Sequence, residues 1–295
     1  MNPKPKKSKI QFFCGIDLAA SPSKTRVCVL SQNSRGKLKM VVSPMLFNLH
    51  GDSWEQAFED LSTKYSKQVK CILQNPEVSV VVGIDVPFGW PRSFVNAIGK
   101  HSTLSSKSYG WGTREGREKF RFRETDTLIN KTVFKTIKDL YIQGPLSVST
   151  DRLGVTAMVG AELIHHLIAR WNFSVASPFK TPSLSKRKMR SIIEVYPKAS
   201  VTSHLGSKAF RFGRPHYSEW KRKFGNLFAK PESIAFRVVD EWDAWICALT
   251  ARDYYFGNCI AAIPRNSRQK ELFIKEGWIW APRKSTDVRS KGLCR

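Results

Sequence analysis

The chain has 295 residues, 41% of them hydrophobic, which is enough to bury a substantial core. It carries 49 Lys and Arg against 24 Asp and Glu, a net charge of +25, and such an excess attracts polyanions at long range. No apolar run approaches the roughly 18 residues that span a bilayer, and the six cysteines include no C-x-x-C pair. These features argue against a membrane protein, a zinc-ribbon protein and a disulfide framework, and they indicate a soluble protein of the cytoplasm.

A single domain is predicted, because neither a long linker rich in Pro, Gly and Ser nor a repeat of fixed period divides the sequence. Residues 1–9 contain the run KPKKSK and are expected to form a flexible basic arm, followed by one domain over residues 10–295. In a eukaryotic cell the same run could also act as a nuclear localisation signal.

The first third of the chain is predicted to start with three strands joined by tight turns. Residues 10–19 are apolar, residues 24–31 alternate between apolar and polar, and residues 37–43 follow the turn sequence NSRG. Apolar residues at helical spacing predict a helix over residues 53–66. Residues 78–85 then form a strand that is apolar on both faces, as expected of a central strand covered by helices.

The rest of the chain predicts mainly helices. Residues 100–124, rich in Gly, Ser and Arg, are expected to form a loop or lid. The further predicted elements, in chain order, are helices over 126–141 and 151–171, a strand over 190–196, a basic and aromatic insert at 200–232, a helix over 233–257 and an extended segment at 276–282. This order describes an α/β domain with a mixed sheet, and its antiparallel start excludes the simple doubly wound dinucleotide-binding fold.

Two of the predicted strands end on an aspartate. Asp17 ends the first strand, within FCGIDLAA, and Asp85 ends the fourth, within VVVGIDVPFGW. Open α/β sheets place their functional sites at the carboxyl ends of strands, so these positions are candidates for a shared site. Glu194 ends a further strand. For each aspartate taken alone, the alternative is a turn residue that binds its own backbone.

The predicted helix over residues 233–257 carries two more acids, Asp240 and Asp243, three residues apart and therefore on one face. The opposite side, expected to pack on the sheet, consists of Trp242, Trp245 and Leu249. Two acids on so apolar a helix need partners, because a buried unpaired carboxylate is costly. A pairing of Asp240 with Arg237 would satisfy one of them without any site.

Convergence of these acids predicts a metal site. If the strand ends adjoin and the helix crosses them, the candidate catalytic residues that meet are Asp17, Asp85, Asp243, Asp240 and Glu194. Such a cluster repels itself unless cations neutralise it, and carboxylate oxygens prefer hard ions. The expected cofactor is therefore Mg²⁺ or Mn²⁺.

Basic and aromatic residues alternate in the insert, which contains KAFRFGRPHYSEWKRKFG. Cationic side chains suit phosphate contacts and aromatic rings suit stacking on bases, so a nucleic acid, DNA or RNA, is the expected partner. The candidate substrate-binding residues of the insert are Arg211, Arg214, Lys221, Arg222 and Trp220. The alternative is a solvated basic surface without a ligand.

Six short motifs stand in an order similar to that of a known family: GIDLA, GIDVPFGWP, RETD, EVYP, DEWDAWICALTA and EGWIWAP. Together they resemble domain of unknown function 429, a family of predicted nucleases with an RNase H-like fold. The resemblance implies a mixed five-stranded sheet flanked by helices, with the basic insert before the last long helix as this chain's own addition. It also implies metal ligation by Asp17, Asp85 and Asp243, with Asp240 and Glu194 in supporting positions.

The RETD motif matches an Arg-x-x-Asp element of the same family through Arg123 and Asp126. We expect this element to bind substrate, with Arg123 contacting a phosphate. The alternative is local, since Thr125 or Asp126 could cap a helix.

Together these expectations predict a metal-dependent nuclease. In such a hydrolase, two cations activate a water molecule for attack on a phosphodiester bond. One alternative is a non-catalytic nucleic-acid-binding protein of RNase H-like fold with structural carboxylates. A second is an actin-like ATP-dependent phosphotransferase, which shares the fold. The phosphotransferase requires glycine-rich phosphate loops, whereas DLAASPSKT is not glycine-rich and no Walker-type motif occurs in the sequence.

Overall fold

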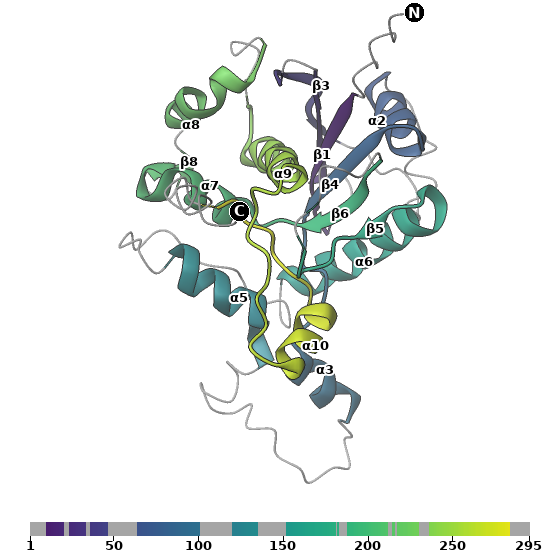
Figure 1. Ribbon diagram of the computed structural model, residues 1–295, viewed down its shortest axis with the longest axis vertical. Coiled ribbons are helices and arrows are strands. Elements are labelled where there is room, and N and C mark those ends of the chain that lie inside the picture. The colour runs from purple at the N-terminus through teal and green to yellow at the C-terminus, as the bar shows by residue number, and fades with distance from the viewer. Residues whose placement is uncertain are drawn as a thin grey trace, which may run out of the picture.

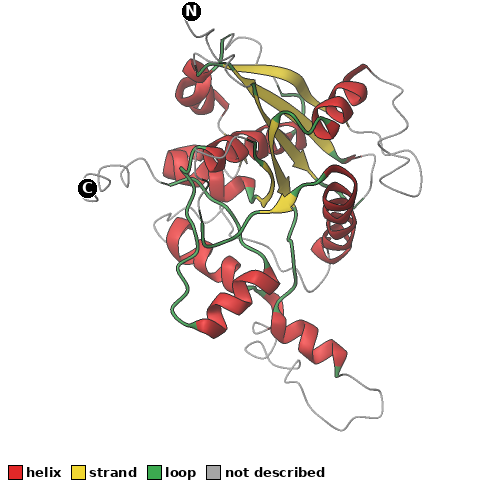
Figure 2. Cartoon of the chain, turned by 45° about the vertical axis from the view of Figure 1, so that its right-hand side comes forward, coloured by secondary structure: helices red, strands yellow, loops and turns green. Residues whose placement is uncertain are grey.

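The computed structural model describes residues 10–20, 24–33, 36–46, 64–100, 120–134, 152–180, 182, 188–211, 214–215, 217–229 and 236–283. These residues form a mixed α/β fold with a six-stranded sheet and helices on both of its faces (Figures 1 and 2). A further group of helices, α3, α5 and α10, lies beyond one end of the sheet, at the bottom of Figure 1. Within the described ranges, no helix combines the length and the apolar character needed to cross a membrane.

The sheet joins an antiparallel meander to a set of parallel strands. Its order is β3-β2-β1-β4-β6-β5, in which β1 and β3 run antiparallel to β2, and β1, β4, β6 and β5 run parallel to one another. The strands are β1 (Gln11–Asp17), β2 (Arg26–Gln32), β3 (Leu38–Leu46), β4 (Ser79–Asp85), β5 (Ser174–Val175) and β6 (Arg190–Glu194). The expected strand count of five was therefore wrong, because β5 has two residues, too few to show any alternation in the sequence.

Helices account for most of the other described residues. They are α2 (Lys64–Gln74), α3 (Arg92–Gly99), α5 (Glu124–Ile129) with the π-helical turn η2 (Asn130–Phe134), α6 (Arg152–Trp171), α7 (Pro197–Leu205), α8 (Tyr217–Phe224), α9 (Val239–Tyr255) and α10 (Ser267–Glu276). Shorter elements are the 3-10 turns η3 (Gly206–Ala209) and η4 (Gly225–Leu227) and the two-residue strands β7 (Phe210–Arg211) and β8 (Arg214–Pro215).

Alternate residues of the central strands feed two separate cores. Phe13, Val81 and Ile193 are buried on the face that α9 covers, in one core with the residues of that helix. Cys14, Val82 and Ile192 point to the opposite face and pack with side chains of α2 and α6. The side-chain period of two in a strand thus places α9 on one side of the sheet and α2 and α6 on the other.

Two glycines bring α9 unusually close to the sheet. A Cβ atom on Gly15 of β1 would overlap the backbone of Ala244 and Ala248, and one on Gly83 of β4 would lie 2.6 Å from the carbonyl oxygen of Cys247. Both positions therefore require glycine, because the helix backbone occupies the space of a side chain. The contact surface of α9 consists of small residues at these points.

This contact corrects the expected orientation of the helix. The sequence predicts that Trp242 and Trp245 pack on the sheet, but they lie in the aromatic core between α9 and α8. The rings of Trp242 and Trp220 are 4.6 Å apart, and those of Trp245 and Phe228 are 5.9 Å apart. Tryptophans against the sheet would hold the helix away from it, whereas the small side of α9 allows the close approach.

Several element boundaries also differ from the predictions. Of the helix expected over 53–66, residues 53–63 lie outside the described part, and α2 instead continues to Gln74. The helix expected over 126–141 is described only to Phe134, where it is partly π-helical, and 101–119 of the expected loop also fall outside the description. The segment 276–282 makes only isolated bridges, from Ile279 and Pro282, and no strand.

Candidate functional site

Asp17 and Asp85 lie side by side at one edge of the sheet. They are in register at the last residues of the parallel neighbours β1 and β4. Because side chains alternate along a strand, both leave the sheet on the face of Gly15 and Gly83, the face that α9 covers. Asp243 stands one turn before Cys247, the residue of α9 that meets Gly83, so the close helix contact brings a third aspartate to the same edge.

The electrostatics of the three aspartates show that they act on one another. Burial raises the pKa of Asp17 well above its ordinary value, and the charges of Asp243 and Asp240 raise it further, against an opposing effect of Arg26. Burial also raises the pKa of Asp85, assisted by the charges of Asp17 and Asp243. Such mutual repulsion indicates a cluster of like charges held together by the fold.

Asp243 is the third member of the cluster with a raised pKa. Burial raises its pKa from 3.8 to about 7, with a further contribution from Asp240 and an opposing one from Lys198. Asp240 lies in the first turn of α9 and therefore adds to the negative potential of the cluster.

Among the described residues, no group neutralises this cluster fully. In the part of the chain that the structure describes, the carboxylates of Asp17, Asp85 and Asp243 make no hydrogen bond and no ion pair within 4 Å. Arg26, the register partner of Asp17 on β2, and Lys198 act on it only through their charges. Buried carboxylates are normally paired with a cation or a hydrogen-bond donor. Because these three lack such a partner among the described residues, their oxygens are open to an external cation.

The donor chemistry of this aspartate cluster, defined here as Asp17, Asp85 and Asp243, fits a hard divalent ion. Its geometry is open: across the described ranges, no three His, Cys, Asp or Glu side chains already stand as a ready ligand set. The three carboxylates repel one another and have no hydrogen-bond or ion-pair partner among the described residues.

A cavity of about 240 Å³ opens beside Asp17 and Asp85. Its wall also includes Tyr196, Thr156 and the loop residues after each of the two strands. The pKa of Tyr196 is raised by burial and then by the charges of Asp85 and Asp243, which places its hydroxyl within the field of the cluster. The cavity gives Asp17 and Asp85 a route to solvent and to a small polar group.

Glu194, Arg123 and Asp126 line the same cavity and form a second group of charges. This group, called the arginine clamp below, is fully buried. The guanidinium binds Glu194 through Nη1 and Nη2 at 2.9 and 2.5 Å, and Asp126 through Nε and Nη2 at 3.2 and 2.9 Å. Its fifth N–H group donates to the carbonyl of Glu276 at 2.9 Å. Burial alone would lower the pKa of Arg123, but the two carboxylates raise it, so the cation is fixed.

The arginine clamp therefore changes two expected roles. Arg123 was expected to contact a substrate phosphate, yet all five of its N–H groups are used within the protein and its side chain is 2% exposed. Asp126 also accepts a hydrogen bond from the Arg123 backbone at 2.9 Å, so the pair closes the start of α5. These two residues connect α5 to β6 and do not present a binding surface.

Glu194 belongs to this group for a reason that lies in the sheet register. It pairs with Ile84, one residue before Asp85, so its side chain leaves the sheet on the face opposite to Asp17 and Asp85. There it meets Arg123 and accepts a hydrogen bond from the Phe88 backbone at 3.0 Å. Its charge still acts on Asp85, and each of its oxygens accepts at least one hydrogen bond within the protein.

Sequence reasoning did not identify Glu276 and Gly277, which complete the clamp. The Glu276 carboxylate accepts hydrogen bonds from the backbone of Arg92 at 2.7 Å and of Glu124 at 2.8 Å. Gly277 has a φ of +86°, and a Cβ there would lie 2.7 Å from a Glu194 oxygen, so both conformation and space require glycine. The only sequence feature that could have indicated them is the EG pair at the start of the EGWIWAP motif.

The candidate binding residues of the insert divide into a buried and an exposed set. Trp220 is 1% exposed and stacks on Phe224 with ring centroids 4.6 Å apart, so it is a core residue and not a stacking platform for bases. Lys221 and Arg222 lie on the solvent side of α8. Arg211 and Arg214 belong to β7 and β8, but the description does not extend to their side chains.

Tyr196 and Lys198 were given no role in the sequence analysis, although Tyr196 lies within the EVYP motif. Both follow β6 directly, where the chain turns into α7 with Pro197 in its first turn. Their position next to the aspartate cluster is set by this turn, and only the spatial proximity of α7 to α9 reveals it.

The comparisons with known proteins give one match. A family model described as Protein of unknown function (DUF429) matches residues 15–268, which include most of the described residues and every acid considered above except Glu276. No curated protein and no solved structure matches the chain.

Proposed function

The chain belongs to the DUF429 family, whose function is unknown, and from that premise we propose that it is a metal-dependent nuclease of RNase H-like fold. The observation that carries the proposal is the aspartate cluster: three carboxylates from β1, β4 and α9, mutually repelling and without a neutralising partner among the described residues. The arrangement of the sheet, an antiparallel meander beside parallel strands, supports the fold assignment.

Asp17, Asp85 and Asp243 would hold the cation in this proposal. A bound divalent ion supplies an activated water and charge stabilisation for a developing oxyanion. The residues of the chain set the conditions for that chemistry. The 240 Å³ cavity admits a phosphate group, and Tyr196, which lines it, offers a hydroxyl that can orient the phosphate. The charge of Lys198 acts on Asp243.

The arginine clamp has a supporting role. Its five internal hydrogen bonds fix β6 and α5 on one side of the cavity, so the strand ends that carry the aspartates stay in place. The net charge of +25 brings a polyanionic substrate to a site that is itself acidic, and the exposed cations of α8 provide phosphate contacts away from it.

A cleavage assay tests the proposal. Labelled single-stranded, duplex, hybrid and branched nucleic acids are incubated with the protein and Mg²⁺ or Mn²⁺, with and without a chelator. We expect cleavage that requires the metal, and a loss of at least about 100-fold in Asp17→Asn, in line with disturbed metal sites. Glu77→Gln, at an exposed carboxylate in an ion pair with Lys188, is the matched control.

Two results would argue against the proposal. Cleavage that persists in the chelator, or that Asp17→Asn leaves intact, would remove the aspartate cluster from the chemistry. Salt-sensitive binding without cleavage of any substrate would instead favour a non-catalytic nucleic-acid-binding protein.

A further inference from the structure

A second and larger cavity, of about 530 Å³, lies on the other side of the arginine clamp. It is enclosed by α6, α10, the end of β6 and the segments after β5 and α10. Glu194 lines both this cavity and the one at the aspartate cluster, so one carboxylate separates the two. Cavities of about 300–1,000 Å³ commonly hold small organic ligands.

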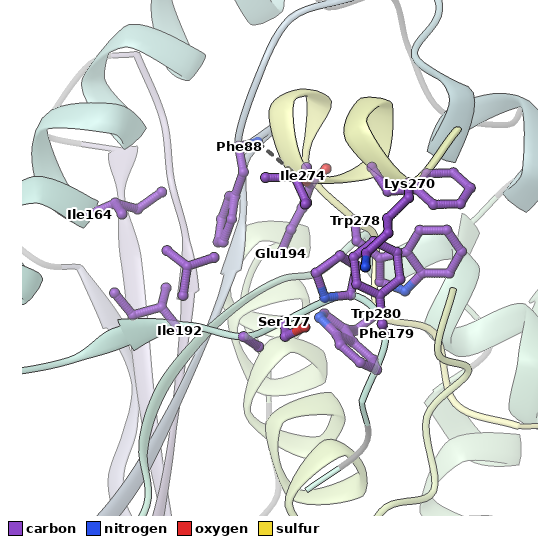
Figure 3. A pocket seen from close by; sticks show the side chains of 15 residues that line it. Phe88, Ile164, Ser177, Phe179, Ile192, Glu194, Lys270, Ile274, Trp278 and Trp280 are labelled. Carbon is purple, nitrogen blue, oxygen red and sulfur yellow. Dashed lines mark hydrogen bonds between the residues drawn. The ribbon is translucent and has the colours of Figure 1, made fainter. Parts of the chain in front are cut away.

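The walls of the larger cavity are aromatic and aliphatic. In Figure 3, Glu194 lies near the centre of the view, with Ile164 and Ile192 to one side and Phe179, Trp278 and Trp280 to the other. Trp278 is held in place by a hydrogen bond from its Nε1 to the carbonyl of Ile260 at 3.1 Å. This combination offers flat apolar surfaces to a planar ring.

Glu194 supplies the one carboxylate among the lining residues, and the described donors do not saturate it. One oxygen accepts from Arg123 Nη1 and from the Phe88 backbone, at 2.9 and 3.0 Å, whereas the other accepts only from Arg123 Nη2. A carboxylate offers about four acceptor positions, so one remains, on the oxygen that Arg123 Nη2 binds. A ligand with an N–H group can use it, while an alkyl chain would leave it desolvated and a carboxylate ligand would be repelled.

A cation stands at the mouth of the cavity. Lys270 of α10 is exposed, with its ammonium 5.6 Å from the centre of the Phe179 ring. A phosphate attached to a ligand in the cavity would find this charge where the cavity meets solvent.

We propose that this cavity binds a nucleobase of the nucleic-acid substrate, with the ring against the aromatic wall and an N–H edge toward Glu194. The inference rests on the proposed function and deepens it, because it assigns to the nuclease a pocket for an unpaired base beside the cleavage site. A base can enter such a pocket only when it is out of the duplex, so the substrate is single-stranded or locally unpaired at this position.

The test uses nucleosides as probes and calorimetric titration of the full chain in chelator, where no cleavage occurs. Uridine is compared with 3-methyluridine, which has the same ring but lacks its N–H donor, and with ribose, which lacks the base. We expect uridine to bind, 3-methyluridine to bind at least about tenfold more weakly, as for a lost hydrogen bond to a charged group, and ribose not to bind measurably.

A pair of variants locates the binding. Ile274 is 62% exposed and lines the cavity, and Ile263 is 88% exposed and does not. Ile274→Trp should narrow the cavity and weaken uridine binding by about tenfold or more, at the scale of base stacking on an aromatic surface. Ile263→Trp should leave it unchanged. Thermal melts verify that both variants are folded.

Equal affinity for uridine and 3-methyluridine, failure of uridine to bind at its solubility limit, or insensitivity to Ile274→Trp would overturn the proposal. These results are distinguishable from a failure of the proposed function. Loss of cleavage in Asp17→Asn together with absent uridine binding removes the base pocket alone. Uridine binding together with metal-independent or absent cleavage removes the aspartate cluster from catalysis and leaves a nucleoside site.

Discussion

The two groups of carboxylates at this end of the sheet differ in how their charge is balanced. In the arginine clamp, Arg123 uses all five N–H groups, four of them on Glu194 and Asp126, and the group is buried. In the aspartate cluster, burial raises the pKa of all three carboxylates, the charge of Asp243 raises those of Asp17 and Asp85 further, and none of the three accepts a hydrogen bond from the described residues. Asp17 and Asp85 of the cluster line the same cavity as the three residues of the clamp. Acids in similar positions therefore have different roles. The balanced group stabilises the fold, whereas the unbalanced group keeps negative charge that a bound cation can neutralise.

Breaking the balanced group should have the largest effect on stability. Arg123→Met keeps the side-chain length but leaves Glu194 and Asp126 buried without their cation, and we expect a loss of about 3–5 kcal/mol in the free energy of unfolding. Urea denaturation measures it. Lys188→Met removes an exposed pair with Glu77 at 2.7 Å and should cost at most about 1 kcal/mol. Equal losses in the two variants would contradict the distinction.

The unbalanced group should respond to metal. Mg²⁺ or Mn²⁺ at about 100 times its dissociation constant should add roughly 2.7 kcal/mol to the stability of the wild type, visible as a higher melting temperature. Asp85→Asn should retain only part of this gain because a ligand charge is lost. Glu271→Gln, at an exposed pair on α10, should retain all of it. A shift of the same size in Asp85→Asn would show that the ion binds elsewhere.

A smaller effect should appear with pH. Because the pKa of Asp243 is raised from 3.8 to about 7 in the folded protein, mainly by burial, its ionisation disfavours the fold. The neutral form is present in both states below about pH 4, so the penalty grows as pH rises toward 7 and is constant above.

Asp243→Asn stays neutral and should therefore gain melting temperature relative to the wild type between pH 4 and 7, by roughly 2–4 °C for each kcal/mol. Melts of both proteins in chelator across this range measure the difference. A difference that does not change with pH would mean that Asp243 is not strained by ionisation.

The sequence predicted much of the fold and part of this comparison. The strands that end at Asp17 and Asp85 were predicted from the pattern of apolar residues, because that pattern reflects which side chains are buried. The convergence of Asp17 and Asp85 with the acids of α9 was expected from the same patterns, and the family resemblance singled out Asp243 among those acids. The partner of Glu194 could not be predicted, because it depends on a one-residue offset in the pairing of β6 with β4. Such register is a property of the assembled sheet.

The burial of Trp220 also could not be predicted from the local sequence. Its neighbours in the sequence are basic, and that composition predicts an exposed binding element. The ring nevertheless contributes to the core because it packs on Trp242, which lies 22 positions later in the chain, at 4.6 Å. Aromatic residues suit both roles equally, so only tertiary contacts distinguish them.

The same contrast between balanced and unbalanced charge should appear, at its weakest, on the surface of α8. Arg222 is 68% exposed and pairs with Glu219 at 2.7 Å, whereas Lys221 is exposed and has no acidic partner among the described residues. If α8 contacts nucleic acid, Lys221→Ala should reduce the slope of log affinity against log salt by about 0.9, the value for one lost phosphate contact on duplex DNA. Arg222→Ala should reduce it less, because part of its charge already serves Glu219. Both variants lower the net charge by one, so long-range attraction changes equally and the difference between their slopes isolates the direct contact.

Titrations of a labelled duplex at several salt concentrations, in chelator to prevent cleavage, give the slopes. If the two slopes fall equally, balance within the protein does not govern these contacts; if neither falls, α8 faces away from the nucleic acid.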